Sequence, residues 1–574
     1  MKYSYHLTIL MLVLVSGLNA QGPVWNWSTS CGNTGNDKSL DVAMGSDGSV
    51  YSCGFFNGTG TFGSITTGSG GYSKDAFVAK QDALGNYIWA NYCNSGLDDR
   101  ALGVHVDKDD NVIICGTFWS SMQVGPYYLA GSADSPFIVK YDQAGNLIWA
   151  VTGGGDGDDH AFDIVTDQLG NIYVTGFLST HYGPPVCTAQ FGSLPPFSYS
   201  DSIAFLAKLS PAGVWQWVRT FDGADVQRDN DIVIDNNAGV YVVGGFYGAN
   251  KTFGTSTLSS VANSRDIYVV KYDVLGNYQW VKQVGGYNDD RANGVTCGAD
   301  GFLYVTGEFR AELNFDGDTL NNNGGPGGKD IFVAKMDQQG NWLWASKAGS
   351  DSGGESGRAI SSNGQHCIYV TGQIKGANVR FGNNITLNTG TDSVQIFTAG
   401  IDTAGVWRWA VQAGGAGEDR GYGIECTNDC KVYTVGFYQG PTSTFGPHTE
   451  TSYGFKDGYT FRLDATCFNY VNDTLSSVNE WSASCTPYAG QLLMPDNGSQ
   501  LGAVYLHNIS CLNEGEWVIY NILGEPVYRT TQLSEGWNGT DVNGNKLPAG
   551  TYVWRLNTAD NHDLQYSGRI VLVR

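Results

Sequence analysis

Ile331–Trp344 (IFVAKMDQQGNWLW) is one copy of a stretch that recurs along the chain and decides its fold. The other full copies are Ala76–Trp89, Pro136–Trp149, Ala204–Trp217, Ile267–Trp280 and Ile396–Trp409. A seventh copy, Gly458–Asp464, stops after its first half, and Trp25 and Trp27 supply the missing half near the N-terminus. The tryptophans at 27, 89, 149, 217, 280, 344 and 409 are spaced by 62, 60, 68, 63, 64 and 65 residues. A period this regular indicates a repeat architecture.

One repeat predicts four short strands. A Gly- and Asn-rich loop separates the second strand from the third, and a Gly-containing turn joins the third to the fourth. For the unit that follows Asp290-Arg291, the predicted strands are Ala292–Thr296, Phe302–Phe309, Asp330–Asp337 and Asn341–Lys347. The second strand contains a Gly in every unit, which marks the close approach of another backbone, and we expect that backbone to come from the neighbouring unit.

Seven units of four antiparallel strands predict an all-β fold, a seven-bladed β-propeller. We expect Val24–Thr29 to be the outer strand of the blade whose other strands lie within Tyr422–Asp464. The N-terminal strand would then close the ring, which an open solenoid does not require.

Composition and the N-terminal sequence limit the possible partners and the cellular location of the protein. The net charge of −23 argues against nucleic acid or an anionic membrane as a partner. Residues 1–20 read as a signal peptide, because Lys2 precedes the apolar run Leu7–Val15 and the small-residue stretch Ser16–Ala20. No later segment is apolar enough for a transmembrane span, so we expect a secreted or outer-membrane surface protein. We expect this protein to be a monomer.

The repeat resembles the secreted bacterial β-propeller repeat family of the SBBP type. The resemblance rests on the Asp-x-x-Gly-Asn-x-x-Trp turn, the Tyr-Val-Thr-Gly strand and the Phe-Val-Ala-Lys strand, and it covers about residues 22–467. It implies the propeller fold and an extracellular setting, and it implies no fixed activity.

After Cys467 the pattern ends. The expected domains are the signal peptide 1–20, the propeller 21–467, a linker 468–484 and a small C-terminal β-sandwich 485–574. This last part, with Trp537-Asn-Gly-Thr, Pro548-Ala-Gly-Thr-Tyr and a final apolar strand ending in Arg574, resembles the C-terminal sorting domains of the Bacteroidetes type IX secretion system. It is closest to the type B, gliding motility-associated, version, with type A left open. The resemblance implies the type IX secretion machinery as a partner.

Acidic–basic pairs precede the first strand of most units, where a propeller has the mouth of its central channel. Residues of this ring are the candidate ligand-binding set: Asp99, Arg100, Asp159, His160, Arg228, Asp229, Asp290, Arg291, Arg358, Asp419 and Arg420. Because a pair repeated in nearly every blade serves the repeat, we expect interblade ion pairs and hydrogen bonds to loop amides. Catalysis would need an asymmetric constellation, and no catalytic residue is assigned.

Metal and disulfide sites are less defined. No Cys-x-x-Cys pair occurs, which argues against zinc held by cysteines. Calcium has two candidate loops, Asp156–Asp159 and Asp316–Asp318 with Asn321–Asn323, but no complete ligand set, and no other cofactor is expected. Disulfides are considered for Cys426–Cys430 and Cys485–Cys511, and the equivalent positions of Cys31 and Cys93, and of Cys53 and Cys115, hint at pairing.

The sequence therefore favours an exported β-propeller that acts as a binding or adhesion module for a glycan or a protein. The alternative is a carbohydrate-active enzyme, a lyase or glycosidase, with its site at the channel mouth.

Overall fold

The computed structural model describes residues 22–466, except 69–70, 223–229, 325–327, 352, 365–366 and 391–392, and parts of the chain beyond residue 487. Two compact units are separated, Met1–Asn469 and Tyr470–Arg574. The predicted signal peptide, the linker and the pair Cys485 and Cys511 lie outside the described residues.

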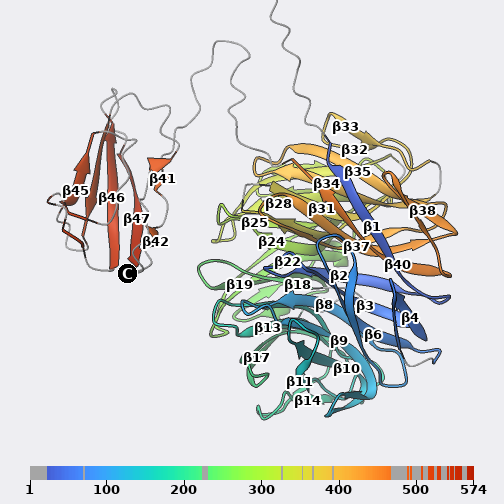
Figure 1. Ribbon diagram of the computed structural model, residues 1–574. Helices are drawn as coiled ribbons and strands as arrows, with labels where there is room; N and C mark the ends of the chain where they lie inside the picture. The colour runs from blue at the N-terminus through green and yellow to red at the C-terminus, as the bar shows by residue number, and fades with distance from the viewer. Residues whose placement is uncertain are drawn as a thin grey trace, which may run out of the picture. The chain divides into compact units, whose positions relative to one another are not determined.

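The first unit is a propeller of seven four-stranded antiparallel sheets (Figure 1). In order from the innermost strand outward, the first blade is β2 (Lys38–Met44), β3 (Val50–Asn57), β6 (Lys74–Gln81) and β7 (Tyr87–Cys93), and the second is β8 (Arg100–Val106), β9 (Val112–Val124), β10 (Tyr127–Tyr141) and β11 (Leu147–Thr152). The third blade is β12 (His160–Thr166), β13 (Ile172–Leu178), β16 (Ile203–Leu209) and β17 (Trp215–Asp222), the fourth is β18 (Asp231–Ile234), β19 (Gly239–Tyr247), β22 (Arg265–Asp273) and β23 (Tyr278–Val284), and the fifth is β24 (Arg291–Cys297), β25 (Leu303–Phe309), β28 (Asp330–Met336) and β29 (Trp342–Gly349). The sixth blade is β30 (Ser356–Ser362), β31 (Cys367–Lys375), β34 (Val394–Asp402) and β35 (Trp407–Gly415), and the seventh is β36 (Arg420–Cys426), β37 (Lys431–Gln439), β40 (Lys456–Asp464) and β1 (Val24–Gly32).

The N-terminal strand closes the ring, as predicted. Strand β1 pairs antiparallel with β40, in a register that runs from Val24 opposite Asp464 to Cys31 opposite Gly458. Figure 1 shows the blue β1 beside the orange β40. The seventh blade is thus built from both ends of the repeat region, and it has no turn between its third and fourth strands.

The repeated tryptophan explains the period. The indole N–H of Trp149 donates to the carbonyl oxygen of Pro211, 3.1 Å away, in the turn between the third and fourth strands of the next blade. Within that turn, a side chain at Gly213 would meet the Trp149 ring 2.9 Å away, and this Gly has φ +76°. The same indole contact to the next blade is made by Trp27, Trp89, Trp280 and Trp344. The turn and the tryptophan of the motif therefore recur together because each pair joins two blades.

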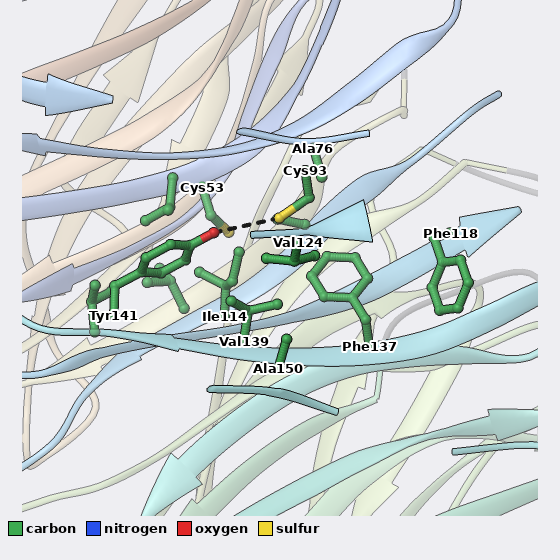
Figure 2. Packing of buried hydrophobic residues seen from close by; sticks show 14 of the residues in the cluster. Cys53, Ala76, Cys93, Ile114, Phe118, Val124, Phe137, Val139, Tyr141 and Ala150 are labelled. Carbon is green, nitrogen blue, oxygen red and sulfur yellow. Dashed lines mark hydrogen bonds between the residues drawn. The ribbon is translucent and has the colours of Figure 1, made fainter. Parts of the chain in front are cut away.

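Apolar side chains fill the space between blades. Between the first and second blades, Cys53, Ala76 and Cys93 pack against Ile114, Val139 and other residues of β9 and β10 (Figure 2). The Cys93 Sγ lies 3.5 Å from the Tyr141 hydroxyl, which gives this buried phenol a polar neighbour. Removal of this surface from water is the main stabilising contribution at each blade boundary.

The glycine inside each second strand has a different cause from the one predicted. A side chain at Gly116 would collide with the carbonyl oxygen of Arg100, which belongs to the first strand of the same blade. The register shifts by one residue there, between Ala101 and Gly103. The glycine thus accommodates a β-bulge within its own blade, and the expected approach of a neighbouring unit is wrong for this position.

The loop between the second and third strands is more ordered than predicted. In the fifth blade it forms a hairpin of β26 (Glu312–Phe315) and β27 (Asp318–Asn321). In the sixth blade the corresponding hairpin, β32 (Val379–Phe381) with β33 (Ile385–Leu387), extends the sheet of the fifth blade through β29. The sequence of this loop differs from blade to blade, so the hairpins could not be predicted from the repeat. In the sixth blade the hairpin pairs with the outer strand of the preceding blade, which is a tertiary contact.

The cysteine pairings considered for Cys426 with Cys430, Cys31 with Cys93, and Cys53 with Cys115 are not formed. Cys426 is a free thiol, so the Cys426–Cys430 disulfide considered above is wrong. Cys31, Cys53, Cys93 and Cys115 are also free, and all four are buried. They pack as small apolar side chains in the blade cores.

The second unit contains a five-stranded sheet with strand order β42-β47-β46-β44-β45. Its main strands are β44 (Gly515–Tyr520), β45 (Pro526–Thr530), β46 (Gly550–Thr558) and β47 (Gln565–Val573). Trp517 is fully buried in this sheet. In the described part of the chain no helix has the length and apolar character needed to cross a membrane.

Candidate ligand-binding mouth of the channel

The first strand of each blade begins at one end of the central channel, which we call the mouth. A cavity of about 470 Å³ opens there. Because strands alternate in direction, the loops after every second and fourth strand lie at the mouth, and the two hairpin turns of each blade lie at the far end. The cavity is lined by the cations Lys38, Lys74, Arg100, Arg358 and Arg420.

The aspartates of the predicted ring point away from this cavity and brace the loops. Asp290 is fully buried, and it accepts hydrogen bonds from the backbone N–H groups of Gly286 and Arg310, each at 2.9 Å. Burial raises the pKa of Asp290 to about 7 against the effect of these bonds. The same position is filled by Asp37, Asp99, Asp159 and Asp419, each with N–H donors from the loop before it and the loop after the second strand. These carboxylates are therefore held by backbone N–H groups of their own surroundings, and a structural role for them stays a prediction.

The basic partners have a different environment. Arg100 and Arg420 line the cavity, whereas Arg291 lies 4.0 Å from Glu308 and His160 lies beside Asp158. Neither Arg291 nor His160 is among the residues that line the cavity. Arg228 and Asp229 lie outside the described residues.

Arg358 occupies another register than the one assumed from the sequence. In the sixth blade Glu355 precedes the first strand where the first, second, third, fifth and seventh blades have the buried aspartate. Arg358 is the bulged residue between Gly357 and Ala359, and it lines the cavity from that position. The bulge turns the side chain toward the channel, and the same position in other blades is held by Leu40, Leu102, Phe162, Asn230, Asn293 and Tyr422.

Two of the five cations lack a carboxylate partner among the described residues. Lys74 and Arg100 both pair with Asp98, and Arg420 pairs with Glu418. Lys38 instead lies over the Phe437 ring, 4.5 Å from its centroid, and Arg358 lies 5.2 Å from the centroid of Tyr422. Burial lowers the pKa of Lys38, which shows that its ammonium is held out of bulk water. The mouth is thus a cationic well in a protein whose net charge is −23.

Exposed aromatic side chains surround the well. The loops at the mouth carry Tyr72, Tyr182, Tyr287, Tyr453 and Phe455, which are between 47% and 101% exposed. Beside Tyr72, a surface pocket is lined by Leu97 and Trp119. At the far end the exposed apolar residues of the turns are aliphatic: Leu84, Leu169, Val214, Leu275 and Val406. Exposed aromatic groups thus occur in the loops at the mouth, whereas the repeated turns at the far end expose aliphatic ones.

Carboxyl groups form the floor of the well. Asp41, Asp163 and Asp231 occupy one position of the first strand, next to the bulge, and they line both this cavity and a second cavity toward the far end. Gly103, Gly294, Ala359 and Gly423 hold that position in the other blades. Each of the three aspartates reaches into another blade: Asp41 accepts from Val104 N–H, Asp163 from Ile232 N–H and Asp231 from Val295 N–H.

Burial in the channel perturbs these acids. It raises the pKa of Asp41 to about 8, and that of Glu425, deeper in the channel, to about 8. It also raises the pKa of Asp163, with a further contribution from the charge of Asp231. None of these residues is among the candidates predicted from the sequence. The signal was present, because Asp41 and Asp163 both stand four residues after the braced aspartates Asp37 and Asp159.

The two loops considered for calcium use their oxygens within the protein. Asp316 accepts from Trp342 N–H at 3.2 Å, and Asp318 accepts from Ala345 N–H at 3.1 Å. In the other loop, Asp159 braces backbone amides while Asp158 contacts His160. The acidic groups of each loop therefore point to different partners.

Comparison with known proteins identifies the second unit. Residues 493–572 match the CHU_C Type IX secretion signal domain. The propeller resembles an uncharacterized WD repeat-containing protein of Acanthamoeba polyphaga mimivirus, 24% identical over 62% of this chain and 32% of that protein. It also resembles the regulatory protein FlaEY of Caulobacter vibrioides, 25% identical over 26% of this chain and 15% of that protein. The chain thus spans about a third or less of the length of these relatives.

Solved structures give weaker likenesses. A puromycin hydrolase is 12% identical, with TM-score 0.36 over 71% of this chain and 50% of its own. A fungal alcohol oxidase with copper is 11% identical, with TM-score 0.37 over 96% of this chain and 100% of its own. Likenesses at this level carry no argument about activity.

Proposed function

Because the chain carries a CHU_C type IX secretion signal domain, it is a secreted or outer-membrane surface protein, and we propose that its propeller is a binding module for an anionic glycan. The observation that carries this proposal is the cationic well, in which Lys38 and Arg358 have no carboxylate partner among the described residues. A ligand with carboxylate or sulfate groups would supply the missing charge, and each such contact would be strengthened by partial exclusion of water.

The aromatic rim supports a glycan as the anionic ligand. Tyr72 and Phe455 stand on loops next to Lys74 and Lys456, so apolar faces and charges alternate at the mouth. Sugar rings have apolar faces that pack on aromatic rings, and acidic substituents at their edges can then meet the cations. Adhesion to an acidic polysaccharide outside the cell is the role that this combination favours.

A glycan array with the mature full-length protein tests the proposal. We expect binding to uronate-containing or sulfated glycans and no comparable binding to neutral ones, with affinity that falls as salt is added. Lys38→Gln should weaken binding by about tenfold, the equivalent of about 1.4 kcal/mol. Lys108→Gln is the matched control, because Lys108 is exposed on a far-end turn and should not affect binding. Equal binding of neutral glycans, or an equal effect of both variants, would contradict the proposal.

A lyase or glycosidase is the second candidate, and the carboxyl pair on the floor favours it. The side chains of Asp163 and Asp231 interact directly beneath the cations, and paired carboxyl groups are the usual acid–base apparatus of such enzymes. Release of new reducing ends or unsaturated products from a bound glycan, abolished by Asp163→Asn, would establish this activity. Binding of the glycan without its cleavage would contradict the enzyme and support the binding module.

A further inference from the structure

The boundary between the second and third blades differs in charge from its equivalents. A backbone hydrogen bond defines the equivalence, because the N–H of each braced aspartate donates to a carbonyl oxygen of the previous blade's third strand. The acceptors for Asp37 and Asp419 are Lys456 and Val394. Asp99 donates to Lys74, Asp159 to Asp134 and Asp290 to Arg265. Lys74, Asp134 and Arg265 therefore occupy one position at three blade boundaries.

At two of these boundaries the position is cationic. Lys74 pairs with Asp98, and Arg265 pairs with Asp289 at 3.1 Å. A second base follows each acid, Arg100 in one case and Arg291 in the other, so each trio carries one net positive charge. The acid before the braced aspartate is thus neutralised from both sides.

At the third boundary the strand residue is itself an acid. Asp134, Asp158 and His160 form the corresponding trio, whose net charge is −2 with a neutral imidazole and −1 with a protonated one. His160 Nε2 lies 2.8 Å from Asp158 Oδ1 and 3.6 Å from Asp134 Oδ2. One ligand atom from each of the three residues lies within 4.8 Å of the others.

We propose that Asp134, Asp158 and His160 bind a divalent transition-metal ion, of which zinc is the best-fitting example. Two carboxylate oxygens and one imidazole nitrogen are a ligand set that zinc accepts, with a further position open to water. The ion would stand where the ammonium group of Lys74 and the guanidinium group of Arg265 stand at their boundaries. This inference does not depend on the glycan proposal.

The surrounding structure fixes these side chains. Asp158 N–H donates to the His181 carbonyl oxygen at 3.0 Å, and Asp159 N–H donates to the Asp134 carbonyl oxygen at 3.0 Å. The His160 ring stacks on Phe177, with centroids 4.9 Å apart. The three side chains are only 14–22% exposed, so a bound ion would be partly shielded from water. Ligands held in place before binding lose little entropy when the ion arrives.

A proton competes with the metal for His160. An imidazole binds a metal ion through an unprotonated ring nitrogen, so the ring must be neutral when the ion is bound. Without metal, the protonated imidazole can serve as the cation of the trio. Metal binding must displace that proton, so affinity should increase with pH and binding should release a proton.

Calorimetric titration of the metal-free, mature full-length protein with zinc tests the site. We expect one zinc per chain, proton release, and a melting temperature that rises with zinc concentration. Asp134→Lys and His160→Arg each install the residue found at the boundary between the first and second blades. Each should weaken zinc binding by about a hundredfold or more, because loss of a direct ligand exceeds the roughly 10–100-fold effect of outer-shell partners.

The melting temperature of each metal-free variant separates loss of the site from loss of the fold. Because Asp134→Lys restores the charge pattern of the other boundaries, the metal-free variant should melt at or above the temperature of the metal-free wild type. His448→Ala, in β39 (His448–Thr451), removes a histidine outside the trio and should leave zinc binding unchanged. No zinc binding to the wild type, or equal binding to folded Asp134→Lys, would overturn the proposal.

Discussion

Trp149 of the second blade donates its indole N–H to the carbonyl oxygen of Pro211 in the third, 3.1 Å away, whereas the indole N–H of Trp409 is buried without a hydrogen-bond partner among the described residues. The difference follows from ring closure. The seventh blade joins β40 to β1 across the two ends of the repeat region, so it lacks the turn that would accept the Trp409 bond. The indole bond thus joins the blades at the boundaries that follow Trp27, Trp89, Trp149, Trp280 and Trp344, and it is missing at the boundary between the sixth and seventh blades.

This pair gives a direct measurement of the interblade bond. Trp149→Phe should lower the free energy of unfolding by about 1 kcal/mol more than Trp409→Phe, because both lose ring area but only the first loses a hydrogen bond. Chemical denaturation of the two variants supplies the comparison. Equal losses would show that the indole bond contributes nothing measurable.

The braced aspartates should be structural in solution. Asp290→Asn should cost about 1–3 kcal/mol, because an amide NH₂ group would face one of the two backbone N–H donors. Asp201→Asn is the control, since Asp201 is 73% exposed in a surface pair with Lys251, and such pairs contribute about 0–1 kcal/mol. Thermal unfolding of both variants checks this, and unchanged stability of Asp290→Asn would refute the bracing role.

The acids on the channel floor predict a pH dependence. The pKa of Asp41 rises from 3.8 to about 8 through burial, so between these pH values the folded state holds the proton more tightly than the unfolded state. The contribution of Asp41 to stability is therefore largest at low pH and falls as the pH rises toward 8. Asp41→Asn, which cannot ionise, should flatten the decline between pH 5 and 8 by up to about 1.4 kcal/mol per pH unit. Parallel stability curves for both proteins would contradict the perturbed pKa.

Export should depend on the second unit and not on the propeller. Removal of residues 485–574 should leave a folded propeller that accumulates in the periplasm of the native host, because the matched secretion signal lies within the deleted part. Fusion of these residues and a signal peptide to an inert reporter should send the reporter to the surface or medium. Cell fractionation measures both results, and normal export of the truncated protein would show that another part of the chain carries the address.

Several features of the site could be read from the sequence only in part. The acidic–basic pairs were found because they repeat, and their position at the mouth follows from the strand order. The sequence could not show that the aspartates are buried or that, of their basic partners in the described residues, Arg100 and Arg420 line the cavity while Arg291 and His160 do not, because these environments depend on tertiary contacts. Arg358 is itself the bulged residue of its blade, two residues along the strand from the position that Arg291 and Arg420 hold in theirs.

By itself the sequence determined the seven-bladed ring, the shared last blade and the secretion domain. These features rest on periodicity and local motifs, which persist in the linear chain: a Trp every 60 to 68 residues and an unfinished last copy. Only the tertiary structure decided which charges meet. Lys74, Asp134 and Arg265 are equivalent because the backbone of the next blade bonds to them, and Asp41, Asp163 and Asp231 converge because closure of the ring brings distant first strands around one channel. Contacts between blades are set by the geometry of closure, and no local pattern of residues encodes them.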